Sequence, residues 1–137
     1  MTYYNTLIEV APDTRARAGI VPPERDGKKS IALLEYELIS AAPYVHTQEE
    51  VQFAVHVTRT GIDSRELELR RQELWDEFFS RSRACMRSSP LPKLYGWGLH
   101  FNGEGRVALV AMESAEYARL LNDPSVTKTR AMRSRRA

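Results

Sequence analysis

The sequence is poor in the residues that build disulfides and metal sites. It has one cysteine, Cys85, and three histidines among 137 residues. A single cysteine excludes a disulfide within the chain, and the spacings His-x-x-x-His and Cys-x-x-Cys, which would indicate a metal site, do not occur. No apolar run approaches the length of a membrane span, and the first residues lack the basic and apolar regions of a secretion signal. We therefore expect a cytoplasmic protein with no membrane contact, metal or cofactor.

Positive charge is concentrated at the C-terminal end. The net charge of the whole chain is +2, but the last eleven residues hold five cations and no acid: Lys128, Arg130, Arg133, Arg135 and Arg136. Basic segments of this kind bind nucleic acid in some proteins, although most only solubilise the chain or lie on an acidic surface. Residues 127–137 are therefore a candidate nucleic-acid contact, although a nucleic acid is a less favoured partner than a small ligand.

The stretch from residue 95 to residue 112 is typical of a β-hairpin. Large apolar side chains alternate with small or polar ones, which is the period of a strand: Tyr95, Trp97, Leu99 and Phe101 against Gly96, Gly98 and His100. Residues 102–105 (Asn-Gly-Glu-Gly) supply the positive φ that a tight turn needs. Residues 107–112 are apolar on both faces, which predicts a strand in the centre of the sheet. We expect the core to form around this hairpin.

Two more strands and a long loop are predicted outside the hairpin. Residues 5–10 form a short β-type run, and residues 126–132 are a marginal edge strand whose charges would discourage further pairing. Residues 12–29 contain three prolines and two glycines, which predicts a long loop.

Capped apolar patterns predict four helices, over residues 31–41, 48–59, 64–81 and 115–121. We assign Ile31, Leu34, Leu38 and Ala41 to the buried stripe of the first. Two signals conflict in the second: apolar residues alternate as in a strand, whereas Thr47 and Glu50 form a capping box. We follow the capping box. Residues 82–92 are predicted to connect the third helix to the hairpin.

Together these elements predict an α+β fold. A small antiparallel sheet holds the N-terminal strand and the C-terminal hairpin, with three to four helices mainly on one face. At this length, residues 1–137 are expected to form a single domain. A chain of this size buries enough surface to be stable without disulfides or metals.

Two places could bind a ligand. Lys28, Lys29 and Ser30 lie at the start of the first predicted helix, where cations and free amides favour an anion; a solvated loop with a plain N-cap is the alternative. Gly96 and Gly98 would leave the strand backbone open near His100, in a groove beside the Pro-rich loop; a helix packed against the glycines is the alternative.

Three catalytic alternatives stay open. His100 or His56 could act with a nearby glutamate as acid and base on a small anionic substrate. Two histidines could also meet Glu9, Glu35 or Glu113 in a metal site. Cys85, flanked by two arginines that would lower its pKa, could be a nucleophile, although lone cysteines are mostly small buried hydrophobes.

Several stretches carry a family resemblance. The sequence resembles a family of uncharacterised small microbial proteins, catalogued only as a domain of unknown function, through residues 5–13 (Asn-Thr-Leu-Ile-Glu-Val-Ala-Pro-Asp), 31–38 (Ile-Ala-Leu-Leu-Glu-Tyr-Glu-Leu), 43–51 (Pro-Tyr-Val-His-Thr-Gln-Glu-Glu-Val), 89–100 (Ser-Pro-Leu-Pro-Lys-Leu-Tyr-Gly-Trp-Gly-Leu-His) and 131–136 (Ala-Met-Arg-Ser-Arg-Arg). The resemblance covers nearly the whole chain and implies a complete single-domain protein. It implies no activity, cofactor or catalytic residue.

The sequence therefore leaves three functions, in this order. The first is a small binding or interaction module for a small, anionic ligand, in a chain that could be homo-oligomeric. The second is an enzyme that uses His100 or His56 with a glutamate. The third is nucleic-acid binding through residues 127–137.

Overall fold

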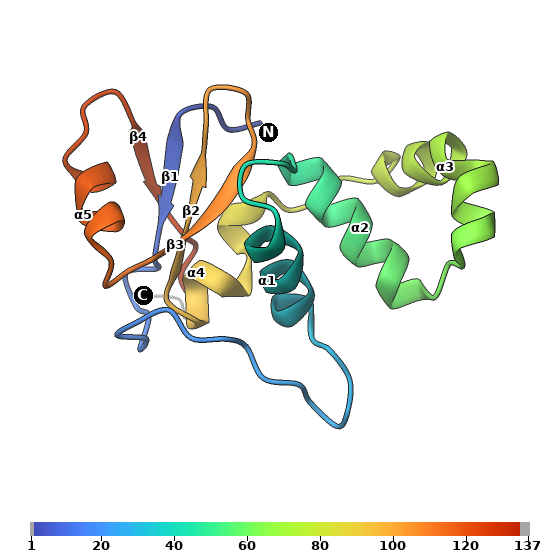
Figure 1. Cartoon of the computed structure of the whole chain (residues 1–137), viewed down its shortest axis with the longest axis horizontal. Coiled ribbons are helices and arrows are strands. Elements are labelled where there is room, and N and C mark those ends of the chain that lie inside the picture. Colours follow the sequence, from blue (N-terminus) through green and yellow to red (C-terminus); the bar gives the residue numbers. More distant parts are fainter. Residues whose placement is uncertain (1, 135–137) are drawn as a thin grey trace.

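Figure 1 shows the computed structural model of the chain, which describes residues 2–134. The elements in chain order are β1 (Thr6–Glu9), α1 (Ile31–Ala41), α2 (Gln48–Thr60), α3 (Ser64–Phe79), the 3-10 helix η1 (Met86–Ser88), α4 (Pro90–Leu94), β2 (Trp97–Phe101), β3 (Val107–Ala111), α5 (Ala115–Leu121) and β4 (Thr127–Arg130). The α+β class and the pairing of the N-terminal strand with the hairpin are confirmed.

The four strands form one sheet in the order β3-β2-β1-β4. β2 is antiparallel to both β1 and β3, whereas β4 runs parallel to β1. The sheet is therefore mixed, and the prediction of a purely antiparallel sheet is wrong for its last strand. The reason is the crossover through α5, which returns the chain to the far edge in the direction of β1.

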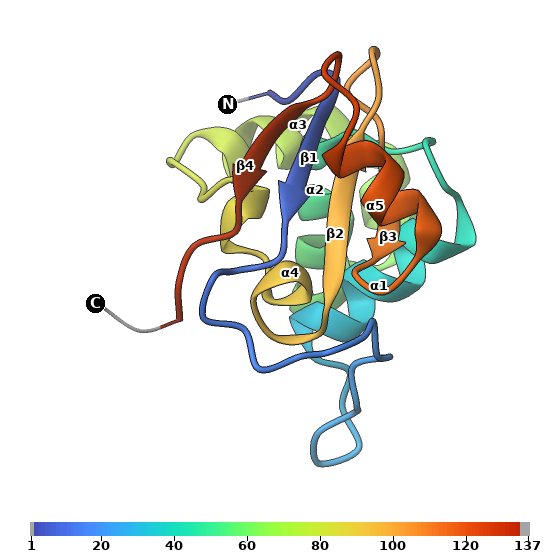
Figure 2. The same cartoon turned by 90° about the vertical axis from the view of Figure 1, so that its left-hand side faces the viewer.

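Helices cover both faces of the sheet. The larger core lies between the sheet and the helices α1, α2 and α4, and its fully buried side chains include Ile8, Val51, Leu91, Leu99 and Phe101. The smaller core lies under α5, which faces the viewer in Figure 2, and contains Leu7, Val110, Tyr117, Leu120 and Val126. Consecutive residues of one strand, Leu7 and Ile8, therefore enter different cores.

The capping box decides the conflict over α2. Thr47 Oγ1 accepts the Glu50 N–H, and Glu50 Oε1 accepts the Thr47 N–H. The alternating apolar residues have another cause, because α2 is buried on two sides. Val51 and Val55 enter the sheet-side core, whereas Phe53 packs on Trp75 and Phe78 of α3. In Figure 1, α2 and α3 extend away from the sheet.

Three local predictions are wrong. β3 is an edge strand rather than a central one; it is nevertheless largely buried, and residues 44–46 pair with Val107 along its outer side. The connecting segment contains η1 and α4, which Ser89 caps and whose prolines need no N–H in the first turn. Tyr95 ends α4, so the aromatic strand begins only at Trp97.

The predicted phase of α1 is also wrong. Its buried residues are Ala32, Leu33, Glu35 and Ile39, whereas Ile31 is 39% exposed. Apolar residues occur all around this helix, so their pattern does not single out one face.

Within residues 2–134, every helix is either too short or too polar to span a membrane.

Candidate functional site

Lys28, Lys29 and Ser30, which the sequence proposes as an anion site, line one pocket. The pocket lies between the start of α1 and the end of α2 and has a volume of about 600 Å³. We call it the basic pocket; its lining residues are Arg25, Lys28, Lys29, Ser30, Leu34, Thr58 and Arg59. Four of these seven carry a positive charge, and no described residue that lines the pocket is acidic. The field inside therefore favours an anion.

A two-residue turn positions two of these cations. Arg25 and Lys28 exchange two backbone hydrogen bonds of 2.9 Å, and the residues between them, Asp26 and Gly27, both have positive φ. This geometry is that of a tight hairpin turn, and the turn projects from the body in Figure 2. Like charges placed directly opposite each other destabilise a hairpin. An anion between Arg25 and Lys28 would relieve that repulsion.

The helix termini contribute the rest of the basic pocket. Ser30 caps α1 by accepting the Leu33 N–H at 3.2 Å, so its hydroxyl proton stays available to a ligand. Arg59 lies in the last turn of α2. Lys29 is partly neutralised, because its ammonium group is paired with Glu37 at 2.8 Å on the exposed surface. Arg25, Lys28 and Arg59 are therefore the cations on which binding of an anion would mainly depend.

A second pocket of about 260 Å³ adjoins the first, and we call it the Glu35 pocket. Arg59 lines both pockets. The polar lining of the Glu35 pocket is Glu35, Gln52, His56, Arg59, Thr60 and Arg83, and its apolar lining is Ile31, Val55, Phe78 and Ala84. Apolar walls with a few convergent polar groups are the usual composition of a small-molecule site.

Glu35 is the unusual residue of this pocket because it is only 5% exposed. Burial raises the pKa of its carboxyl from 4.5 to about 7, and the hydroxyl of Ser89, which donates to Oε1 at 2.7 Å, opposes that rise. Ser89 also accepts the Leu91 N–H, so Glu35 ties α1 to the cap of α4. Near neutral pH this carboxyl can therefore either hold or release a proton.

The opposite wall is an aromatic and cationic stack. The His56 ring packs on Phe78 with centroids 4.4 Å apart, and the Arg83 guanidinium lies 3.9 Å from the centre of the Phe78 ring. The Nε of Arg83 donates to the Phe78 carbonyl at 2.9 Å. Burial and the nearby Arg83 lower the pKa of His56. Arg83 is thus held in place as a cation, and His56 is neutral at neutral pH.

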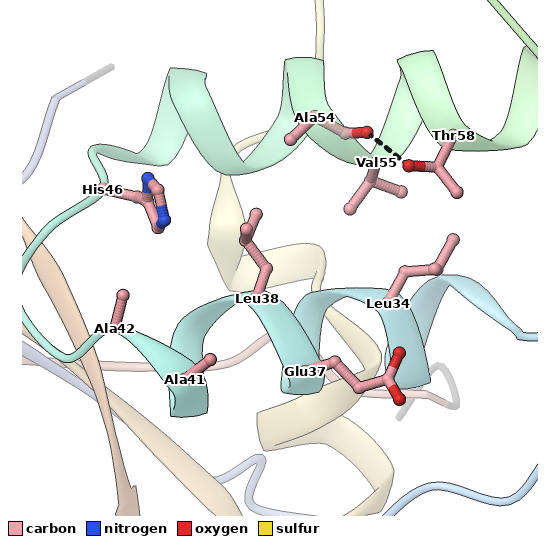
Figure 3. Close-up of a pocket in the computed structure, with 9 residues that line it drawn as sticks. All are labelled: Leu34, Glu37, Leu38, Ala41, Ala42, His46, Ala54, Val55 and Thr58. Atoms are coloured by element: carbon pink, nitrogen blue, oxygen red, sulfur yellow. Dashed lines mark hydrogen bonds between the residues drawn. The ribbon is translucent and has the colours of Figure 1, made fainter. Parts of the chain in front are cut away.

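A third depression runs between α1 and α2 and is mostly apolar. Figure 3 shows Leu34 and Leu38 of α1 facing Val55 of α2, with the His46 ring at one end of this interhelical groove. Leu34 and Thr58 also line the basic pocket, so the groove adjoins it at the other end. The interhelical groove, the basic pocket and the Glu35 pocket therefore adjoin one another along α1 and α2.

The space beside Gly96 and Gly98 is filled rather than open: the alternative of a packed helix holds at Gly98, where α5 lies, and the loop covers Gly96. A Cβ at Gly96 would lie 2.1 Å from the Ala18 carbonyl oxygen, and one at Gly98 would lie 2.6 Å from the Tyr117 ring. The loop also bonds directly to the hairpin, because Trp97 Nε1 donates to the Ile20 carbonyl at 2.8 Å. The predicted groove between hairpin and loop is therefore wrong, since α5 and the loop occupy it.

His100 lines neither the basic pocket nor the Glu35 pocket. Its Nδ1 is hydrogen-bonded at 2.7 Å to the hydroxyl of Tyr44, a residue with the unusual φ of 58°. Burial lowers the pKa of His100 and raises that of Tyr44. The structure thus separates His100 from Lys28, Lys29 and Ser30, with which it was grouped as a candidate binding residue.

Two of the five C-terminal cations lie on the edge strand β4. Lys128 and Arg130 belong to β4, where Lys128 Nζ donates to the Asp123 carbonyl and the Arg130 carbonyl accepts from Arg87. Arg133 is exposed, and Arg135 and Arg136 lie outside the described residues.

The thiol of Cys85, the candidate nucleophile, accepts a hydrogen bond from the Tyr3 hydroxyl at 3.1 Å. In residues 2–134, no cluster of His, Cys, Asp or Glu could hold a metal.

Sequence reasoning missed most of the Glu35 pocket. Glu35 was weighed only as a metal ligand, although a carboxylate inside the apolar run Ala32-Leu-Leu-Glu-Tyr36 is a detectable signal. Arg59 and Arg83 gave no signal, because nothing local distinguishes them from the many other surface cations. Contacts between residues distant in sequence bring these side chains together.

Comparison with known proteins identifies the chain by family alone. No curated protein and no solved structure matches it. A family model described as a family of unknown function (DUF6157) matches residues 1–137. The chain belongs to this family, DUF6157, along its whole length.

Proposed function

We propose that this protein is a small binding module for an anionic ligand, held in the basic pocket by Lys28, Lys29, Ser30, Arg25 and Arg59. The observation that carries the proposal is a pocket of about 600 Å³ lined by four cations and no described acid. Opposed cations at the 25–28 turn and the free amides at the start of α1 add to the attraction. Arg25 and Lys28 lie directly opposite each other, a placement that an anion between them would favour.

A second candidate function is acid–base catalysis on the bound anion. One observation favours it: His56 and Glu35 line the same pocket, next to the cations. His100 lines neither of these pockets, so we propose this alternative with His56. Nucleic-acid binding by residues 127–137, a cytoplasmic location and a homo-oligomeric state stay predictions.

The replacement of Lys28 and Lys29 by alanine tests the proposal. We expect the double variant K28A/K29A to bind sulfate at least about tenfold more weakly than the wild type, because two cations leave the pocket. Sulfate is chosen because its charge does not change near neutral pH. Titration followed by NMR chemical shifts measures the dissociation constant, which added sodium chloride should also raise.

The matched control is R15A/R17A, which removes the same charge from exposed positions in the same loop. Its sulfate affinity should equal that of the wild type within about twofold, since neither arginine lines the basic pocket. If both double variants bound sulfate equally weakly, the loss would come from net charge alone and the proposal would be overturned. An undiminished sulfate affinity in K28A/K29A would overturn it as well.

A further inference from the structure

The basic pocket and the Glu35 pocket are neighbouring parts of one surface. Arg59 lines both, and the consecutive residues Ser30 and Ile31 each line one of them. A ligand held by Arg59 in the basic pocket therefore has the Glu35 pocket directly beside it. The two pockets differ in character, because the first is lined mainly by exposed cations and the second has apolar walls.

The lining of the Glu35 pocket indicates what it could accommodate. Ile31 and Val55 provide apolar walls, whereas the buried ring of Phe78 is already in contact with His56 and Arg83. A volume of about 260 Å³ suits a small ring or a branched apolar group. The charged and titratable groups around Glu35 are His56 and Arg59 of α2 and Arg83 before η1, while α4 contributes the Ser89 hydroxyl.

We propose that the Glu35 pocket takes the uncharged body of the same anion, so that the ligand is a small amphipathic organic acid with a ring or branched apolar group. Its acidic group lies on Arg59 and the lysines of the basic pocket, and its body lies against Ile31 and Val55, beside Glu35. This inference rests on the proposed function, because it assigns the second half of that binding site.

Glu35 is the polar group that fixes the orientation of the body. Its Oε1 accepts from Ser89, and the side chain lines the cavity although it is nearly fully buried. In its protonated form, the carboxyl adds no negative charge next to an anion and can donate a hydrogen bond to the ligand. The interhelical groove offers no comparable group in its described lining, since its one carboxyl, Glu37, is exposed and paired with Lys29.

Two sulfonates with the same head group measure the contribution of the body. Methanesulfonate and benzenesulfonate carry one charge that does not titrate near neutral pH, and they differ only by the ring. We expect the wild type to bind benzenesulfonate at least about tenfold more tightly than methanesulfonate, because the ring leaves water. NMR titration of the full chain measures both constants.

Two matched variants locate the ring. A84F adds a side chain to an exposed wall of the Glu35 pocket without removing the Ala84 carbonyl, which Gln52 binds. S82F adds the same side chain two residues away, outside this pocket. The preference for benzenesulfonate should disappear in A84F and persist in S82F. A preference that survives in A84F overturns the inference and assigns the ring to another depression.

The pH dependence tests the role of Glu35. From about pH 6 to about pH 8.5, wild-type affinity for benzenesulfonate should fall several-fold as the carboxylate forms beside the anion. E35Q keeps the acceptor for Ser89 and should show no such fall. The same decline in E35Q overturns the role of Glu35 in binding.

Sulfate binding separates the two proposals. If sulfate does not bind, the proposed function fails. If sulfate binds and the ring of benzenesulfonate gives no advantage, only this inference fails.

Discussion

The replacement of Gly96 by alanine is expected to lower the free energy of unfolding by about 3 kcal/mol, from backbone strain and a steric clash together. Gly96 has a φ of 76°, and its Cβ would lie 2.1 Å from the Ala18 carbonyl oxygen and 3.1 Å from the Gly19 nitrogen. Both contacts are with backbone, so no side-chain rotation relieves them. The loop would have to move away from the hairpin, and the bond from Ile20 N–H to the Tyr95 carbonyl would be lost.

Gly61 supplies the matched control, because it has a φ of 72° and its Cβ would meet nothing within 4 Å. G61A therefore isolates the left-handed strain, and we expect it to lower the free energy of unfolding by only about 1 kcal/mol. Urea unfolding of both variants measures the difference. Equal losses would show that residues 18–20 yield readily, and would contradict the tight packing of the loop on the hairpin.

The second large effect is a pH-dependent loss of stability caused by Glu35. The unfolded carboxyl has a pKa of 4.5 and the buried one a pKa of about 7, so the folded state binds more protons between these values. Stability from this group is present below pH 4.5 and is lost as the pH rises through 7. The difference corresponds to about 3 kcal/mol in the free energy of unfolding.

E35Q removes this dependence, because the amide is neutral at every pH and its carbonyl can still accept from Ser89. The free energy of unfolding should therefore fall by about 3 kcal/mol more in the wild type than in E35Q between about pH 5 and pH 8. Urea unfolding at several pH values measures both curves, and parallel curves would contradict a buried, titrating Glu35.

The histidines act in the opposite direction over part of this range. Burial lowers the pKa of His56 and of His100, so they protonate more readily in the unfolded chain and their contribution to stability rises with pH. Both histidines are present in the wild type and in E35Q. Their effect cancels in the difference between the two curves, which is why the difference reports Glu35.

Local signals in the sequence predicted most of the secondary structure. Ser30, Thr47 and Ser114 cap helices where expected, because a cap depends on a hydroxyl and an amide only two or three residues apart. The tight turn at residues 102–105 is equally local. Lys28, Lys29 and Ser30 could be grouped from the sequence for the same reason, since they are neighbours in the chain; their binding of an anion stays a prediction.

Features that depend on distant contacts were not predictable in the same way. The apolar pattern of α1 does not reveal which face of the helix is buried. The burial of Glu35 depends on a distant residue, because Ser89 at the start of α4 donates a hydrogen bond to its carboxyl. The open backbone predicted at Gly96 and Gly98 was wrong. The residues of a strand do not indicate which distant segment packs against them. Ala18 and Tyr117 approach these glycines from far along the chain.

The sequence alone determined the α+β class, the capped helices, the hairpin and the cluster of cations before α1, since each follows from residues close together in the chain. The tertiary structure decided that β4 runs parallel to β1, that Glu35 is buried, and that Arg59 joins two pockets. Strand order, burial and pocket shape depend on which distant segments pack together, and side-chain packing between those segments is not encoded in any local pattern.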